Sequence, residues 1–202
     1  MRAYIDETTP EDKGGIYYVA AAAILLADPA DADAALAAVL PPGRTRPFHW
    51  SREGPQARSR LLDCLQGLGG VAHVCVHYPT GRARQEEARA AVLAAMLPKL
   101  LVDGVDELWI ESRDADQDKR DQALILDVLA RVHPPGGLSY GWHPKPERGL
   151  WLADGVCGAV REYLLGKDRQ PLQQLQRTRV VGELHYLAPS RGQEMRKPRL
   201  PP

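Results

Sequence analysis

The stretch that decides the fold covers residues 3–26 and reads AYIDETTPEDKGGIYYVAAAAILL. Its apolar start ends in two carboxylates, Asp6 and Glu7, and a segment with one proline and two glycines then leads into a long apolar run. Proline and glycine between two apolar runs are typical of a turn that joins two strands. The stretch therefore predicts a β-hairpin made of strands Arg2–Thr8 and Ile16–Leu26.

Beyond the hairpin, strand-like and helix-like segments alternate along the chain. The expected strands cover 71–79, 105–113 and 138–144, and the expected helices cover 28–40, 58–68, 82–101, 114–132 and 150–165. Alternating strands and helices are typical of parallel strands joined by helical crossovers. The predicted fold is thus α/β, with a mixed sheet that has an antiparallel hairpin start and parallel crossovers, flanked by helices.

The composition is that of a folded protein without a dominant charge. The chain has 202 residues, 44% of them hydrophobic, with 26 basic and 26 acidic side chains. A hydrophobic content of this size allows a large core. The zero net charge argues against a broad basic surface that grips nucleic acid nonspecifically, although it leaves room for a local basic groove.

Cysteines and apolar runs point to the compartment. The three cysteines are scattered and form no CxxC pair, which is a poor basis for a disulfide framework. The apolar run 16–26 is shorter than the about 20 residues of a membrane-spanning helix, and the N-terminus lacks the pattern of a signal peptide. We expect a cytoplasmic protein with reduced thiols and no membrane association.

The composition changes after Gly166, where Arg, Gln and Pro dominate. We predict one domain over residues 1–166 and a C-terminal extension over 167–202. This extension contains one strand-like island, VVGELHYL, and ends in a polar, proline-rich stretch that is typical of a mobile chain end.

Three carboxylates stand at the ends of expected core elements. Asp6 ends the first strand, Glu111 ends LWIE, and Asp154 lies in LWLADGVCGAV early in the last helix. If the first and fourth strands are neighbours and this helix packs over them, the three carboxylates meet, and hard oxygen ligands suit Mg²⁺ or Mn²⁺. Gly155 and Gly158 would let the helix backbone approach the sheet. Alternatively, Asp154 is a surface residue that interacts with the helix dipole.

Four short motifs resemble the bacterial proteins grouped as "domain of unknown function 3800", in the ribonuclease H-like superfamily. They are YIDET at 4–8, FHW at 48–50, LWIESRD at 108–114 and LWLADGVCGAVRE at 150–162. The resemblance implies a ribonuclease H-like fold in which Asp6, Glu111 and Asp154 are catalytic metal ligands. In that family the later strand more often ends in aspartate, and the fourth carboxylate of ribonuclease H itself has no evident counterpart here.

The motifs therefore predict a metal-dependent phosphodiesterase that cleaves nucleic acid with Mg²⁺ or Mn²⁺. The candidate nucleic-acid-binding residues are His49, Arg52, His143 and Lys145. The alternative is a non-catalytic ribonuclease H-like module, which the neutral charge and the absent fourth carboxylate favour. For that module the sequence leaves nucleic acid, a protein partner and a second copy of the chain open as partners.

Two further motifs carry weaker metal signals. His73, Cys75 and His77 share one face of a strand, a pattern that a partly covered sheet face explains better than zinc. The stretch DADQDKRDQALI from Asp114 resembles a calcium loop but has lysine where the loop needs glycine. We expect Asp114 or Asp116 to cap a helix instead.

Overall fold

The computed structural model describes residues 1–40, 46–134, 136–144 and 147–187. Its centre is a six-stranded sheet in the order β5-β4-β1-β2-β3-β6. The strands are β1 (Arg2–Thr8), β2 (Tyr17–Leu26), β3 (Val71–Thr80), β4 (Glu107–Glu111), β5 (Ser139–His143) and β6 (His185–Leu187). The α-helices are α1 (Pro29–Val39), α2 (Pro55–Gly67), α3 (Gln85–Val102), α4 (Ala115–Val132), α5 (Arg148–Leu164) and α6 (Gln170–Arg177), with short 3-10 helices η1 (Trp50–Arg52) and η2 (Arg82–Arg84).

The predicted fold class is confirmed by the pairing of the strands. The hairpin strands β1 and β2 are antiparallel, as are β2 and β3, whereas β1–β4, β4–β5 and β3–β6 are parallel. This is the mixed sheet with an antiparallel hairpin start and parallel crossovers, flanked by helices, that the sequence predicts. The central strand β1 joins the antiparallel half of the sheet to the parallel half.

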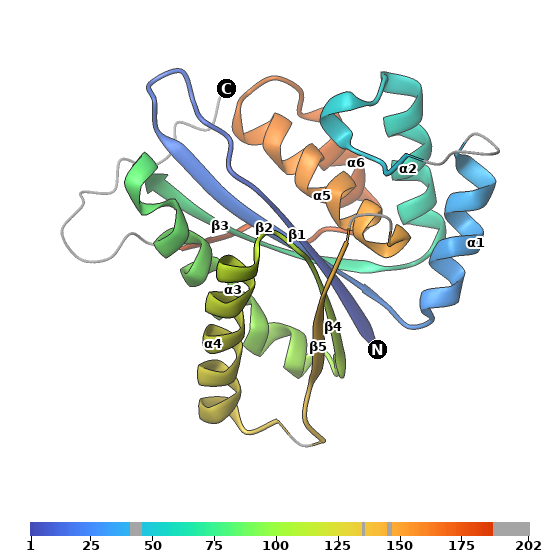
Figure 1. The fold of residues 1–202 in the computed structure, drawn as a ribbon. Helices are drawn as coiled ribbons and strands as arrows, with labels where there is room; N and C mark the ends of the chain where they lie inside the picture. The colour runs from blue at the N-terminus through green and yellow to red at the C-terminus, as the bar shows by residue number, and fades with distance from the viewer. Residues whose placement is uncertain (41–45, 135, 145–146, 188–202) are drawn as a thin grey trace.

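Helices cover both faces of the sheet (Figure 1). Helix α5 packs on β1 and β2 and contacts α1, α2 and α6, whereas α3 packs on β2 and β3 and contacts α4. Strand β2 contributes side chains to the hydrophobic cores on both faces of the sheet, because alternate side chains of a strand point to opposite faces. Tyr18 and Ile24 join the core under α5, and Val19 and Leu25 join the core under α3. Burial on both faces explains why this strand is apolar throughout.

Residues 167–187 contribute more regular structure than the sequence indicates. Helix α6 is not predicted from the sequence, yet its Leu172 and Leu175 are buried in the core under α5. Strand β6 lies in the predicted strand-like island and pairs with β3 at the edge of the sheet. The division of the chain after residue 166 stays a prediction, and residues 188–202, where mobility is predicted, lie outside the described residues.

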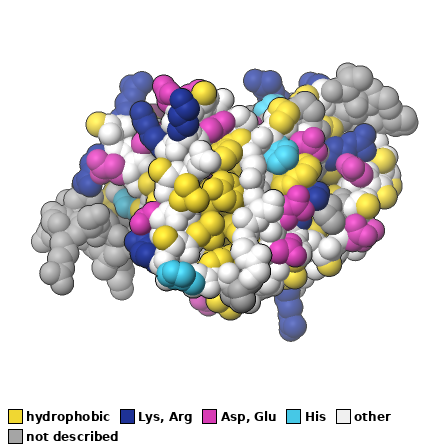
Figure 2. Space-filling model, turned by 60° about the horizontal axis from the view of Figure 1, so that its bottom comes forward, with side chains coloured by type: hydrophobic (Ala, Val, Ile, Leu, Met, Phe, Trp, Pro, Cys, Tyr) yellow, Lys and Arg dark blue, Asp and Glu magenta, His cyan; other side chains and the backbone are white. Residues whose placement is uncertain are grey.

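One face of the molecule shows charges of both signs (Figure 2). Figure 2 shows Lys and Arg interspersed with Asp and Glu around a central strip of hydrophobic side chains. This agrees with the zero net charge of the chain. None of the helices in the described ranges is both long and apolar enough to cross a membrane.

Candidate carboxylate site

Parallel pairing of β1 with β4 brings Asp6 and Glu111 to the same end of the sheet. Ile5 lies opposite Ile110 in this register, and each carboxylate is the next residue along its strand. Asp6 and Glu111 therefore point to the same face, the one on which α5 packs, because side chains of paired residues share a face. Asp6 is 6% exposed, and its Oδ1 accepts a hydrogen bond from the backbone N–H of Glu7 at 2.7 Å.

Helix α5 supplies the third carboxylate. Oδ2 of Asp154 accepts a hydrogen bond of 2.7 Å from the backbone N–H of Trp50, at the start of η1. One turn further along α5, the thiol of Cys157 donates to the backbone carbonyl of Asp6 at 3.1 Å. Burial raises the pKa of this thiol well above its usual value, so it stays protonated and able to donate. These two contacts fix α5 against β1 and orient Asp154.

The three predicted site residues line one cavity of about 320 Å³. Asp6, Glu111 and Asp154 thus come together from β1, β4 and α5, and their role as metal ligands stays a prediction. The other residues that line the cavity are Glu7, Thr8, Thr9, Gln85, Glu86, Arg89 and Arg113. The wall therefore combines five carboxylates with two guanidinium groups.

The glycines of α5 serve a different purpose from the one that the sequence predicts. A Cβ added to Gly158 would overlap the side chain of Trp50, and one added to Gly155 would overlap Leu61 of α2. These glycines therefore admit η1 and α2, so the prediction that they bring α5 close to the sheet is wrong. Gly149 is the glycine of this helix that faces the sheet, because a Cβ there would overlap Tyr4 of β1.

A buried charge network supports the wall of the cavity opposite α5. Arg89 of α3 is 4% exposed and forms ion pairs with Glu7 and with Asp121 of α4. Arg113 lies 3.8 Å from Glu7 and pairs with Glu86 at 2.7 Å. Burial raises the pKa of Glu7 although both arginines act to lower it. Glu7 thus points away from the α5 side, as the strand period predicts.

The sequence contains one signal for this network. Arg89 is spaced three, four and seven residues before Val92, Leu93 and Met96, all buried, so it belongs to the apolar face of α3. A charged residue on the apolar face of a helix requires a buried partner. No comparable local signal identifies Arg113, which lies in the loop after β4.

The donor chemistry of the cavity fits a hard divalent cation, because carboxylate oxygens are the ligands that Mg²⁺ and Mn²⁺ prefer. In the part of the chain that the structure describes, no three His, Cys, Asp or Glu side chains stand in an arrangement that could hold a metal ion. Asp6, Glu111 and Asp154 line the same cavity, and binding of one cation by all three would require these side chains to turn towards one another.

The predicted nucleic-acid-binding residues lie at different distances from this cavity. His49 directly precedes Trp50, and Arg52 is exposed in η1, which places both beside the residue that holds Asp154. His143 is the register partner of Glu111 in the β4–β5 pair. Its ring stacks on Trp109, with 3.8 Å between ring centroids. Lys145 lies outside the described residues.

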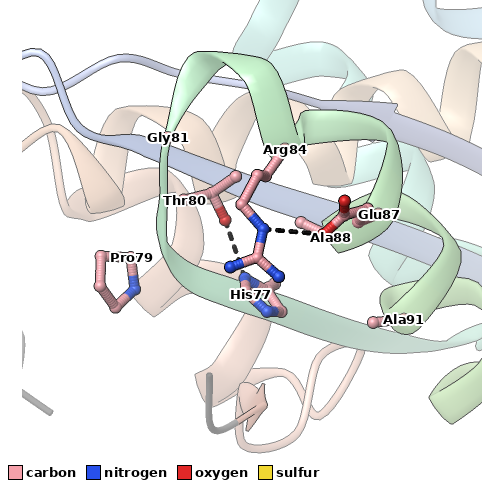
Figure 3. A pocket seen from close by; sticks show the side chains of 8 residues that line it. All are labelled: His77, Pro79, Thr80, Gly81, Arg84, Glu87, Ala88 and Ala91. Carbon is pink, nitrogen blue, oxygen red and sulfur yellow. Dashed lines mark hydrogen bonds and ion pairs between the residues drawn. The ribbon is translucent and has the colours of Figure 1, made fainter. Parts of the chain in front are cut away.

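The histidine-rich strand shows ordinary polar contacts. His73 contacts Asp103, and Nδ1 of His77 lies 2.8 Å from Oγ1 of Thr80 in a small pocket near the end of β3 (Figure 3). Burial, together with the nearby Arg84, lowers the pKa of His77. Cys75, which lies between His73 and His77 in the sequence, is fully buried. These contacts agree with a covered sheet face, the interpretation that the sequence favours.

The acidic stretch after β4 begins a helix, as expected. One carboxylate oxygen of Asp114 accepts hydrogen bonds from the backbone N–H groups of Asp116 and Gln117, which makes Asp114 the N-cap of α4. Asp118 accepts from the hydroxyl of Ser112 at 2.9 Å. Asp114 thus provides a hydrogen-bond acceptor for free backbone N–H groups at the start of α4, which is the capping role that the sequence predicts.

Comparisons with known proteins add a distant structural similarity. A chain in the structure of the PCNA:RNase HII complex from Archaeoglobus fulgidus aligns with a TM-score of 0.48 and 12% sequence identity, over 89% of this chain and 77% of that chain. No protein-family model and no curated protein matches the sequence. The fold assignment therefore rests on the strand order and pairing, and the resemblance to the domain of unknown function 3800 stays a prediction.

Proposed function

We propose that this chain is a metal-dependent phosphodiesterase that cleaves nucleic acid. One observation carries the proposal: carboxylates from β1, β4 and α5, at positions widely separated in sequence, line a single cavity. In this proposal Asp6 and Asp154 bind Mg²⁺ or Mn²⁺, and Glu111 assists them. Such ions, when bound, activate water for attack at phosphorus and stabilise the leaving oxygen.

The contributions of the protein follow from the contacts around each carboxylate. The backbone N–H of Trp50 donates to one oxygen of Asp154, and the backbone N–H of Glu7 donates to one oxygen of Asp6. Both side chains are therefore oriented before any ligand binds. Hydrogen bonds from backbone N–H groups also stabilise the ionised form of a carboxylate, which is the form that binds a cation. Arg89 and Arg113 offset the charge of Glu7 and thereby limit repulsion among the acidic groups.

The nucleic-acid contacts are part of the same proposal. His49 and Arg52 lie close to Trp50 in sequence and would contact the nucleic acid on the α5 side of the cavity. His143 is the register partner of Glu111 and would contact the nucleic acid on the β5 side. Lys145, outside the described residues, stays a predicted contact. A basic or aromatic side chain on each side would hold a strand across the cavity.

The experiment is turnover of labelled RNA, DNA and RNA–DNA hybrid with Mn²⁺ or Mg²⁺. We expect cleavage of at least one substrate by the parent, and loss of more than a hundredfold in rate for Asp6→Asn and Asp154→Asn. Asp127→Asn is the matched control, since Asp127 is exposed on α4 and pairs with Arg131. If the parent cleaves none of the substrates, or if both site variants cleave as fast as the parent, the proposal is wrong.

The second candidate is a non-catalytic ribonuclease H-like module that binds nucleic acid or a protein. It is favoured by the observation that the carboxylates, as they stand, form no metal-binding group among the described residues. Thermal melting with and without Mn²⁺ separates the two. A real metal site raises the melting temperature with metal excess, and the rise disappears in Asp6→Asn and Asp154→Asn. An unchanged melting temperature would favour the module.

A further inference from the structure

A second hollow adjoins the carboxylate cavity on the side of η1. Its volume is about 230 Å³, and it shares Glu7, Thr8 and Asp154 with the first cavity. The residues that line only this second hollow are Trp50, Ser51, Cys157, Gly158 and Arg161. The two spaces thus border the same three residues, so an extended ligand that occupies both would pass Asp154.

Arg161 gives this hollow a positive charge of its own. It is half-buried on α5, seven residues after Asp154. Within the described part of the chain Arg161 has no ion-pair partner, whereas Arg58, Arg89 and Arg113 each pair with a carboxylate. A guanidinium group binds a phosphate through two parallel hydrogen bonds. An unpaired arginine facing a hollow therefore indicates an anion as its ligand.

Two hydroxyl groups complete the set of donors. Thr8 at the end of β1 and Ser51 in η1 line the same hollow as Arg161. The donors come from three separate elements, and packing fixes two of these against each other because Gly158 leaves room for the Trp50 side chain against α5. Cys157 also lines the hollow, and its thiol donates a hydrogen bond to the backbone carbonyl of Asp6. The lining is therefore held in place independently of any ligand.

The spacing relates this hollow to the proposed site of cleavage. Asp154 and Arg161 are about two turns apart on α5, which is about 10.5 Å along the helix axis. A single anion cannot contact both ends, but a polyanionic strand places one phosphate at the carboxylates and a neighbouring phosphate near Arg161. The carboxylate of Asp154, which borders both hollows, disfavours an isolated anion beside it, so a repeating chain of phosphates fits better than a free one.

We infer that the hollow lined by Thr8, Ser51 and Arg161 is a subsite for a backbone phosphate next to the scissile one. The inference rests on the proposed function for the identity of the ligand, a nucleic-acid strand. It assigns Arg161 a role in binding and register rather than in the chemical step. Residue Arg161 lies outside the set that sequence motifs predict for nucleic-acid binding.

The test measures binding separately from cleavage. Affinity for a labelled single-stranded oligonucleotide is determined by anisotropy in EDTA, at several KCl concentrations between about 50 and 200 mM. Each phosphate contact contributes about 0.7 to the slope of log affinity against log salt for a single strand. We expect Arg161→Gln to bind about tenfold more weakly at the lowest salt and to lose about 0.7 of the slope.

Three further variants sharpen the result. Arg161→Lys should keep the slope but lose affinity, since the charge remains while the bidentate geometry is lost. Ser51→Ala should lose affinity with little change in slope, because a neutral hydroxyl releases no counterion. Arg131→Gln is the matched control, since Arg131 is an exposed arginine at the far end of α4. It should match the parent in both affinity and slope.

Several outcomes would overturn the subsite. They are no binding by the parent, an unchanged slope in Arg161→Gln, or an equal loss of slope in Arg131→Gln. Melting temperatures verify that each variant is folded. If Arg161→Gln is unfolded, Arg161→Lys replaces it, and an affinity equal to that of the parent, or a lost slope, counts against the subsite. Cleavage by Asp6→Asn is read in a separate assay, so failure of the catalytic proposal and failure of the subsite are distinguished.

Discussion

The backbone N–H of Trp50 donates a hydrogen bond of 2.7 Å to Oδ2 of Asp154, across 104 residues of sequence. Arg58 fixes the same tryptophan from the other side, since its Nε donates to the Trp50 carbonyl and its Nη1 pairs with Glu162. A segment that no local pattern connects to α5 thus orients the carboxylate of Asp154.

The contact between Trp50 and α5 predicts the effect of a single methyl group. Gly158→Ala would place a Cβ inside the space of the Trp50 side chain. We expect a loss of about 1–3 kcal/mol in the free energy of unfolding, because overpacking forces the neighbours apart. Gly67→Ala is the control, since a Cβ there meets no neighbouring atom and alanine favours a helix. Urea unfolding measures both, and equal stabilities would contradict the packing argument.

The buried ion pairs of Arg89 predict a large effect on stability. Arg89→Met leaves Glu7 and Asp121 without their shared partner in the interior. We expect a loss of about 3–5 kcal/mol in the free energy of unfolding, because a buried charge is left uncompensated. Arg131→Met, which breaks an exposed pair, should cost less than about 1 kcal/mol.

A combined variant separates the loss of pairing from the loss of packing. Adding Glu7→Gln and Asp121→Asn to Arg89→Met removes the unpaired charges while it keeps the shapes of the side chains. Urea unfolding should show that this triple variant recovers a substantial part of the lost stability. A triple variant that is less stable than Arg89→Met would mean that charge is not the cause.

The buried thiols predict how stability changes at alkaline pH. Burial raises the pKa of Cys64 and of Cys75 from 9.0 to about 11. The unfolded chain therefore loses these protons at lower pH than the folded chain does. Their contribution to stability is complete below pH 9.0 and is lost as the pH rises through about 11. Unfolding in urea at a series of pH values measures this change.

Alanine variants isolate the two thiols from other groups that titrate in this range. The difference in unfolding free energy between the parent and Cys75→Ala should stay constant up to pH 9.0 and narrow as the pH approaches about 11. Cys64→Ala should behave in the same way. A difference that stays constant throughout would show that the folded and unfolded thiols titrate together.

The N-cap of α4 predicts a modest and local effect. Asp114→Ala removes the acceptor of two backbone N–H groups and should cost about 1 kcal/mol. Asp116→Ala, one residue inside the helix, should change stability by no more than about 0.5 kcal/mol. Thermal melting of the parent with added Ca²⁺ tests whether the stretch from Asp114 binds calcium. A rise in melting temperature that Asp114→Ala abolishes would support the calcium-loop interpretation.

Local patterns determine most of the elements. The strand Arg2–Thr8 has its predicted bounds, and β2 begins at Tyr17, one residue after the predicted start. Such elements can be read from sequence because alternation, turn residues and capping act within a few residues. Helix α6 is not predicted from local sequence because it is short and rich in glutamine and arginine. Its stability depends on the packing of its two buried leucines in the core.

The sequence by itself determined the kind of fold and placed carboxylates at the ends of its core elements, because these depend on local periodicity and strand ends. Only the tertiary structure decided that Asp6, Glu111 and Asp154 line one cavity, since this follows from parallel pairing of β1 with β4 and from the packing of α5. The packing of Trp50 against Gly158, the burial of Arg89 and the hollow beside Arg161 are also tertiary features. They arise from contacts between distant segments, which no local pattern records.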